Sequence, residues 1–137
     1  MKKLKRDVPK CVGCKLCELT CSLAHFKLFS HDLSNIHIDA IEDTCEFTPY
    51  VCVQCEARPC VDTCPVGALS LNQETGAIAV NQEACIFCEA CVGVCETQGI
   101  RVIQYEGNPR LAVCDLCGGK ETPRCAVVCR EKAILFE

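Results

Sequence analysis

Hydrophobic residues along the chain form short stretches, separated by polar turns and by cysteine-rich segments. The stretches PVGALSL, ETQGIRVI and REKAILF each follow a group of cysteines, and each is a turn that leads into a few aliphatic or β-branched residues. The segment ALSLNQETGAIAVN has apolar residues on both sides of a Gly-containing turn, which predicts a β-hairpin. The pattern therefore predicts a repeated unit with short strands.

The segment that begins at Leu19 departs from this repeat. LTCSLAHFKLFSHDLSN carries apolar residues at helical spacing, Leu19, Leu23 and Phe26, with Leu33 as a candidate fourth position. The strand-like IHIDAI follows directly. This pattern predicts a helix followed by a strand, outside the repeat.

Composition limits how this chain can be stabilised. It has 17 cysteines in 137 residues, and these inflate a hydrophobic fraction of 50%, whereas aromatic residues make up only 5% and Trp is absent. A chain of this length allows one domain or two small ones, and ordinary core burial is a weak source of stability for it. We expect a group bound to the cysteine sulfurs to supply part of the folding free energy.

The cysteines could form disulfides or bind metal. A secreted disulfide scaffold needs an export signal, but Met1 is followed by the charged run KKLKRD, and no apolar segment of signal or membrane length comes after it. The cysteine count is also odd. We therefore expect a soluble, cytoplasmic protein of a reducing compartment, without direct membrane insertion, whose thiolates bind metal.

Cysteine spacing distinguishes between the possible metals. CVGCKLCELTC has the spacing C-x2-C-x2-C-x3-C, and the same spacing recurs in a later group: Cys11, Cys14, Cys17 and Cys21, then Cys85, Cys88, Cys91 and Cys95. This is the bacterial ferredoxin run, in which three cysteines bind one 4Fe–4S cubane and the fourth binds a different cluster. Zinc sites pair two separated CxxC units and do not need four cysteines so close together.

Two further groups are stretched variants of the same run. In both, a CxxC turn is followed by a loop and then by C-x3-C: Cys52, Cys55, Cys60 and Cys64 in CVQCEARPCVDTCP, and Cys114, Cys117, Cys125 and Cys129 in CDLCGGKETPRCAVVC. Three thiolates can still converge, while the fourth points away along the next helical turn. The four groups use sixteen cysteines and leave only Cys45.

Residues 51–105 thus have the pattern of one complete two-cluster ferredoxin. The first and fourth cysteine groups would then complete each other around it, with one ferredoxin module nested inside another. An alternative stays open, because RVIQYEGNPRLAV could also be a hairpin that joins the third cysteine group to the fourth.

Nearly the whole chain resembles the four-cluster electron-transfer subunits of molybdenum or tungsten pterin enzymes and some hydrogenases, of the dimethyl sulfoxide reductase iron–sulfur subunit type. The motifs that carry the resemblance are CVQCEARPCVDTCP, with Pro59 and Pro65 beside its cysteines, and AVCDLCGGKETPRCAVVC. The small size is similar to that of the electron-transfer subunit of tungsten-dependent aldehyde oxidoreductases. Ser22, Glu96 and Arg130 stand where a proline often follows the last cysteine of a group.

The resemblance implies an α+β fold of two nested modules around four 4Fe–4S clusters. The inner module would span 51–105, and the outer module would combine 8–50 with 106–137. It also implies that the groups exchange their fourth cysteines. The implied ligand sets are Cys11, Cys14, Cys17 and Cys129; Cys114, Cys117, Cys125 and Cys21; Cys52, Cys55, Cys60 and Cys95; and Cys85, Cys88, Cys91 and Cys64.

Complete sets of four thiolates leave no open coordination position for a substrate, so we expect electron transfer rather than catalysis. The amides of small residues such as Gly13, Gly67 and Gly93 are candidate hydrogen-bond donors that tune the reduction potentials.

The expected partner is a large catalytic subunit, such as a tungsten- or molybdenum-pterin aldehyde oxidoreductase, with a flavin subunit, a ferredoxin or a further copy of the chain as the other redox partner. The alternatives are a free-standing polyferredoxin and the electron-transfer subunit of a hydrogenase or formate dehydrogenase. Candidate contact residues, which could equally pack in the core, are Phe26, Phe29, Phe47, Tyr50 and Phe136.

Other residues with possible chemistry receive simpler interpretations. With four full cysteine sets, we expect His25, His31 and His37 to be surface or helix-packing residues rather than iron ligands. Cys45 is interpreted as a small buried thiol. The basic residues between Lys2 and Arg6 are interpreted as a flexible, solvated terminus. The net charge of −4 disfavours nucleic-acid binding.

Overall fold

The computed structural model describes residues 3–41, 43–119 and 121–137. Within these ranges the chain forms short helices and strand pairs of an α+β fold. The α-helices are α1 (Leu16–Phe26), α2 (Pro59–Thr63), α3 (Ala90–Val94) and α4 (Arg124–Val128), with 3-10 turns η1 (Val8–Lys10) and η2 (Leu116–Gly118). The strands are β1 (Leu4–Arg6), β2 (His37–Ile41), β3 (Glu46–Tyr50), β4 (Leu69–Leu71), β5 (Ile78–Val80), β6 (Ile100–Tyr105), β7 (Asn108–Val113) and β8 (Ile134–Phe136).

The helices α2, α3 and α4 repeat one local design. Each has five residues and ends where the fourth cysteine of a group, Cys64, Cys95 or Cys129, adopts an extended backbone conformation. A turn then leads into β4, β6 or β8. The predicted repeat of a cysteine group, a turn and a short strand is therefore confirmed.

Helix α1 is the exception to this design. It has eleven residues and runs through Cys21, so the chain does not turn into a strand at its fourth cysteine. The expected helix is present, but its buried residues are Cys17, Glu18, Cys21 and Ser22. Leu23 is exposed and Leu33 lies beyond the helix end. Cys17 and Cys21 belong to the main buried cluster, whereas Glu18 accepts the Ile38 N–H and Ser22 donates to the Leu28 carbonyl.

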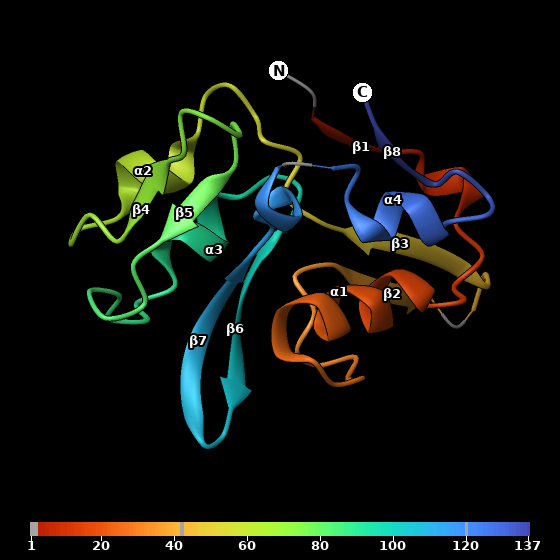
Figure 1. Ribbon diagram of the computed structural model, residues 1–137, viewed down its shortest axis with the longest axis horizontal. Helices are drawn as coiled ribbons and strands as arrows, with labels where there is room; N and C mark the ends of the chain where they lie inside the picture. Colours follow the sequence, from red (N-terminus) through yellow and green to blue (C-terminus); the bar gives the residue numbers. More distant parts are fainter. Residues whose placement is uncertain (1–2, 42, 120) are drawn as a thin grey trace.

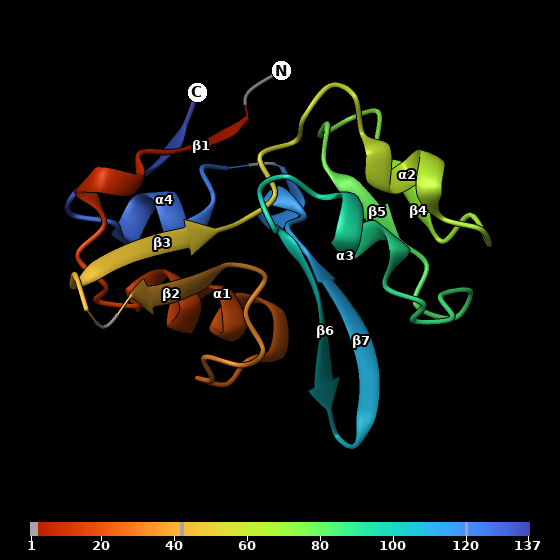
Figure 2. The same cartoon turned by 180° about the vertical axis from the view of Figure 1, so that it is seen from behind.

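The strands pair as antiparallel ribbons, β1 with β8, β2 with β3, β4 with β5 and β6 with β7. The hairpin predicted in ALSLNQETGAIAVN is β4–β5, with Leu69 opposite Val80. RVIQYEGNPRLAV also forms a hairpin, β6–β7, whose turn at Glu106 and Gly107 uses positive φ angles at both residues. Its tip projects from the body of the molecule in Figures 1 and 2.

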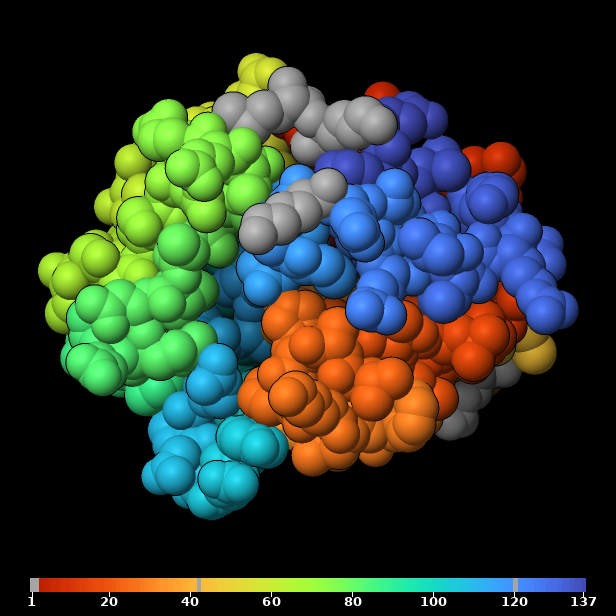
Figure 3. Space-filling model, in the orientation of Figure 1, coloured from red at the N-terminus to blue at the C-terminus, as the bar shows by residue number. Residues whose placement is uncertain are grey.

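Sequence-distant elements pack together in two groups. The helices α2 and α3 contact each other beside β4 and β5, whereas α1 contacts α4 beside β1, β2, β3 and β8 (Figures 1 and 2). In the space-filling view, the yellow and green segments form one side of the molecule, and the orange and dark-blue segments form the other (Figure 3). One buried cluster of apolar residues and cysteines extends through both groups, including Leu4, Ile36, Val51, Leu69 and Ile134.

Gly99 allows a close backbone approach between neighbouring segments, because a Cβ atom there would overlap the backbone of Val51 and Cys52. We expect Gly99→Ala to destabilise the protein by about 1–3 kcal/mol, the usual cost of overpacking. Gly93→Ala is the matched control, since nothing lies within 4 Å of that position and alanine favours the helix. The measurement is anaerobic thermal unfolding, and equal Tm values for the two variants would contradict the close approach.

Candidate metal centres

Sixteen of the cysteines line four cavities, with four cysteines in each. We number the sites as follows: site I is Cys11, Cys14, Cys17 and Cys129; site II is Cys21, Cys114, Cys117 and Cys125; site III is Cys52, Cys55, Cys60 and Cys95; site IV is Cys64, Cys85, Cys88 and Cys91. In every site three cysteines come from one segment, and the fourth comes from a segment distant in the sequence.

The cavities differ in volume. Site I encloses about 360 Å³ between the N-terminal end of α1 and the end of α4, and site III encloses about 220 Å³. The cavities are smaller at site IV, about 20 Å³, and at site II, about 10 Å³. Among the described residues, no three His, Cys, Asp or Glu side chains converge as ligands of a single metal ion would.

Backbone amides donate hydrogen bonds to the cysteine that ends each short helix. The donor is the amide four residues later, so Ala68 N–H lies 3.2 Å from Cys64 Sγ, and the corresponding distances are 3.3 Å at Cys95 and 3.3 Å at Cys129. The turn after the helix brings this amide to the sulfur. Cys21, which lies inside α1, instead accepts from Asn35 N–H at 3.3 Å.

Two of the three glycine amides suggested as donors lower a cysteine pKa, but neither is the main cause of the shift. Burial raises the pKa of Cys11 overall, against the effect of the Gly13 N–H. The pKa of Cys64 is lowered mainly by the Val66 and Ala68 N–H groups, and Gly67 contributes less. The expectation for Gly93 is wrong, because its amide donates to the Glu89 carbonyl within α3.

Burial raises the pKa of several of these thiols. It raises the pKa of Cys17 to about 12, helped by the adjacent Glu18 carboxylate, and that of Cys52 to about 11. The pKa values of Cys114 and Cys125 are also raised by burial. A thiolate at these positions needs a positive counter-charge, and a bound metal group supplies one.

Mutual repulsion between cysteines shows which sites are neighbours. Cys17 of site I raises the pKa of Cys125 of site II, after larger contributions from burial and from site II itself. Cys52 of site III likewise raises that of Cys114 of site II. Cys60 of site III raises the pKa of Cys91 of site IV, again as a lesser cause than burial. These pairs arrange the sites in the order I, II, III, IV.

The sites differ in their access to solvent. Sites I, III and IV each contain one exposed cysteine, Cys14, Cys55 and Cys88, whereas the site II cysteines are buried or partly buried. Exposed apolar side chains line the cavities at both ends of the series. At site I these are Val12 and Leu16, and at site IV they are Val66 and Ile86.

His25 lies beside site II and was not anticipated there from the sequence. Its Nδ1 is 2.8 Å from the Cys21 carbonyl oxygen and 3.7 Å from Cys21 Sγ, and its Nε2 is 2.8 Å from Asp115 Oδ1. The hydrogen bond to Asp115 raises the pKa of His25 to about 11, and the contact with Cys21 adds to the rise. Burial would raise the pKa of Cys21, but His25 and neighbouring donors outweigh it and lower that pKa.

Glu18 is a second buried polar residue that the sequence did not single out. Its side chain is 1% exposed, and it accepts hydrogen bonds from Ile38 N–H and from His31 Nδ1, both at 2.7 Å. His37 Nδ1 lies 3.5 Å away from the same carboxylate. The two histidines lie on the surface, as expected, and contact Glu18 rather than a cysteine.

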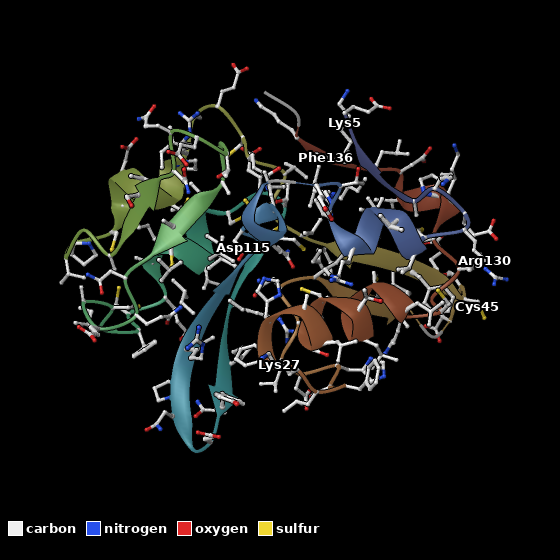
Figure 4. All side chains as sticks on the ribbon, viewed as in Figure 1. Lys5, Lys27, Cys45, Asp115, Arg130 and Phe136 are labelled. Carbon is white, nitrogen blue, oxygen red and sulfur yellow. The ribbon has the colours of Figure 1, made fainter. Side chains whose placement is uncertain are left out.

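Two further expectations are wrong. Cys45 is exposed rather than buried, because it lies in the turn between β2 and β3 with a φ of 55°; Figure 4 shows it at the edge of the molecule. The basic N-terminal segment is not a free end, since Leu4–Arg6 forms β1 and Arg6 donates to the Pro49 carbonyl at 2.8 Å. Lys2 lies outside the described residues.

The aromatic candidates for partner contact are mostly packed. Phe29 is 68% exposed, whereas Phe47 and Phe136 pack against the main core, and Phe26 stacks on Tyr105 with ring centroids 4.6 Å apart. Tyr50 is partly buried in β3. Only Phe29 among these five residues remains a largely exposed surface group.

Comparison with known proteins gives the chemical class of these sites. The family model for a 4Fe–4S dicluster domain matches residues 43–137. The chain belongs to this 4Fe–4S dicluster family. The expectation of a ferredoxin-like iron–sulfur protein is thus confirmed.

The relatives of this dicluster protein are named for electron transfer. The polyferredoxin-like subunit of an aliphatic sulfonate oxidoreductase from Pyrococcus furiosus is 43% identical over 122 residues, covering 89% of this chain and 68% of that one. The putative electron transport protein YsaA of Escherichia coli is 37% identical, covering 93% and 84%. HydN, an electron transport protein of the same organism, is 30% identical, covering 94% and 83%.

A solved structure shares the fold of this dicluster protein. A chain of the active site complex BamBC of benzoyl coenzyme A reductase superimposes with a TM-score of 0.52 at 17% identity, covering 100% of this chain and 79% of that one. No helix in the described parts of the chain is long and apolar enough to cross a bilayer.

The exposure of Cys45 leads to a labelling prediction. In the anaerobic, cluster-loaded protein we expect iodoacetamide to modify Cys45 alone, because metal-bound thiolates are poor nucleophiles and Cys45 is the exposed cysteine outside the four sites. Peptide mass spectrometry locates the label, and Cys45→Ser is the control that should remain unlabelled. Modification of Cys14, Cys55 or Cys88 at a comparable rate would contradict the assignment of those residues to metal sites.

Proposed function

We propose that this chain binds four 4Fe–4S clusters, one in each of sites I to IV, and relays electrons between a large catalytic subunit and another redox partner. The observation that carries the proposal is the set of four cavities, each lined by four cysteines from two separate segments. Residues 43–137 match the 4Fe–4S dicluster family, which supports a 4Fe–4S cluster as the bound group.

The donor sets fit cubane clusters. A cubane takes one thiolate at each of its four irons, so its ligands surround a volume instead of meeting at one atom. The cysteines of each site line a cavity, and within the described residues no three ligand side chains converge on a point. Bound clusters would supply one-electron redox centres, while the chain provides thiolates, amide donors and exclusion of solvent.

The proposal includes the nested organisation. Sites III and IV use cysteines between 52 and 95, within an inner module of 51–105, and sites I and II combine 8–50 with 106–137. The packing of α2 on α3 and of α1 on α4, together with the β1–β8 pair, supports this division. The boundary after residue 105 falls in the turn of the β6–β7 hairpin.

The order of the sites supports a linear relay. Outer-sphere transfer requires neighbouring redox centres, and electrostatic repulsion between cysteines couples site I to II, II to III and III to IV. Site II is enclosed, so electrons reach it through its neighbours. The exposed apolar side chains beside Cys14 and Cys88 are the proposed contact areas at the two ends, because burying them on a partner excludes water around the terminal sites.

The last part of the proposal concerns the proteins between which the electrons pass. We assign the catalytic subunit to the tungsten- or molybdenum-pterin oxidoreductases, such as an aldehyde oxidoreductase, in the cytoplasm. The relative that is named as a subunit of an aliphatic sulfonate oxidoreductase supports a subunit role. The redox partner at the other end is a flavin subunit, a ferredoxin or a further copy of the chain.

The second candidate is a free polyferredoxin or a subunit of a hydrogenase or formate dehydrogenase. The relatives that are named only as electron transport proteins favour a carrier without a dedicated catalytic subunit.

Iron content and ligand exchange can be tested together. We expect about sixteen irons and sixteen sulfides in the anaerobic protein, four of each per cubane. Cys129→Ala should lose about one to four irons and expose Cys11, Cys14 and Cys17 to alkylation, because Cys129 completes site I. Cys45→Ala is the matched control and should keep all the iron. Exposure of Cys114, Cys117 and Cys125 instead would show that the fourth cysteines are not exchanged.

The partner assignment predicts a stable complex. Anaerobic native purification from the source organism should recover the chain with a large subunit that contains tungsten or molybdenum, as shown by mass spectrometry and metal analysis. Recovery as a stable monomer that exchanges electrons with several unrelated enzymes would contradict the subunit role and support the free polyferredoxin.

A further inference from the structure

The fourth cysteine of each group has a recurrent neighbour, the residue four positions later. At Cys64, Cys95 and Cys129 the helix ends, and the backbone N–H of that later residue donates to the sulfur at 3.2–3.3 Å. At Cys21 the helix continues for five more residues, so the amide four positions later is not turned toward the sulfur. The residue at that position is His25, and its side chain occupies the space beside the sulfur.

The hydrogen-bond partners of His25 determine which of its ring nitrogens carry a hydrogen. Nδ1 faces the Cys21 carbonyl oxygen at 2.8 Å, and Nε2 faces Asp115 Oδ1 at 2.8 Å. A carbonyl and an ionised carboxylate only accept hydrogen bonds, so both ring nitrogens carry a hydrogen and the ring bears a positive charge. The side chain of His25 is 22% exposed, which keeps most of it away from solvent. Its Nδ1 lies 3.7 Å from Cys21 Sγ.

Asp115 connects the His25 ring to the segment that carries Cys114 and Cys117 of site II. It lies between Cys114 and Cys117, and its Oδ1 also accepts the Cys117 N–H at 2.9 Å. The His25–Asp115 contact therefore joins α1, which carries one cysteine of site II, to the loop that carries two others. Figure 4 shows Asp115 at the end of β7, where that loop begins.

We propose that His25, held by Asp115, is a positioning residue that places a fixed positive charge beside site II and raises the reduction potential of the cluster there. The inference rests on the proposed function, because it requires a cluster at site II. Reduction adds negative charge to a cluster, and a cation whose Nδ1 lies 3.7 Å from a ligand sulfur stabilises the more negative state. The corresponding cysteines of sites I, III and IV accept a neutral amide from the residue four positions later, whereas Cys21 accepts the Asn35 amide and also lies beside this cation.

The test is an EPR-monitored redox titration of the full cluster-loaded chain, comparing wild type with His25→Gln. We expect one of the four midpoint potentials to fall by about 59 mV, which corresponds to a tenfold change in the one-electron equilibrium. The other three should stay unchanged, and the iron content should equal that of wild type. His31→Gln is the matched control, because His31 contacts Glu18 and no cysteine, and it should leave all four potentials in place.

The possible outcomes separate this inference from the proposed function. Unchanged potentials in His25→Gln, an equal shift in all four, or the same shift in His31→Gln would overturn the role of His25. If His25→Gln fails to fold or loses iron, His25→Asn is measured in its place, since its amide can still donate toward Cys21 without carrying charge. Loss of iron in both variants would assign His25 a purely structural role and overturn the inference. Fewer than four clusters in wild type would count against the proposed function instead.

Discussion

The fold depends on bringing a distant fourth thiol to three thiols that are already close in the sequence. The turns before α1, α2 and α3 place the local cysteines, with left-handed backbone angles at Lys15, Arg58 and Glu89. The fourth cysteine then arrives from a helix of a different segment, which forces α1 against α4 and α2 against α3. The strands form short two-stranded ribbons, and they contribute aliphatic residues such as Leu4, Leu69 and Ile134 to the buried cluster between these helices.

The same arrangement makes stability conditional on the bound groups. Cysteines make up much of the main buried cluster, together with aliphatic residues such as Leu4 and Ile134. Burial opposes ionisation of Cys17, Cys52 and Cys125, so charged ligands there are costly until a metal compensates them. Metal binding and folding are therefore coupled, and removing the clusters removes a large part of what holds the two groups of elements together.

Much of this could be predicted from the sequence, because ferredoxin ligands lie at short and regular spacings. The cysteine groups, the strands after them and the hairpin of β4 and β5 follow from local patterns. Other features depend on contacts that no local pattern encodes. Glu18 is polar and sits in a helix, so its burial is decided only when Ile38 and His31 arrive from beyond the helix. His25 meets Asp115 across 90 residues of sequence, and Arg6 joins a strand only because the C-terminal β8 pairs with it.

The separation of Cys11 from Cys129 in the sequence also imposes an order on biosynthesis. The thiols that line sites III and IV lie between Cys52 and Cys95, so both sets leave the ribosome well before the C-terminal segment does. Cys11, Cys14 and Cys17 are made well before Cys129, the thiol that lines the same cavity. Site I therefore lacks its fourth thiol while the residues of sites III and IV are being synthesised, and it is completed after both of them.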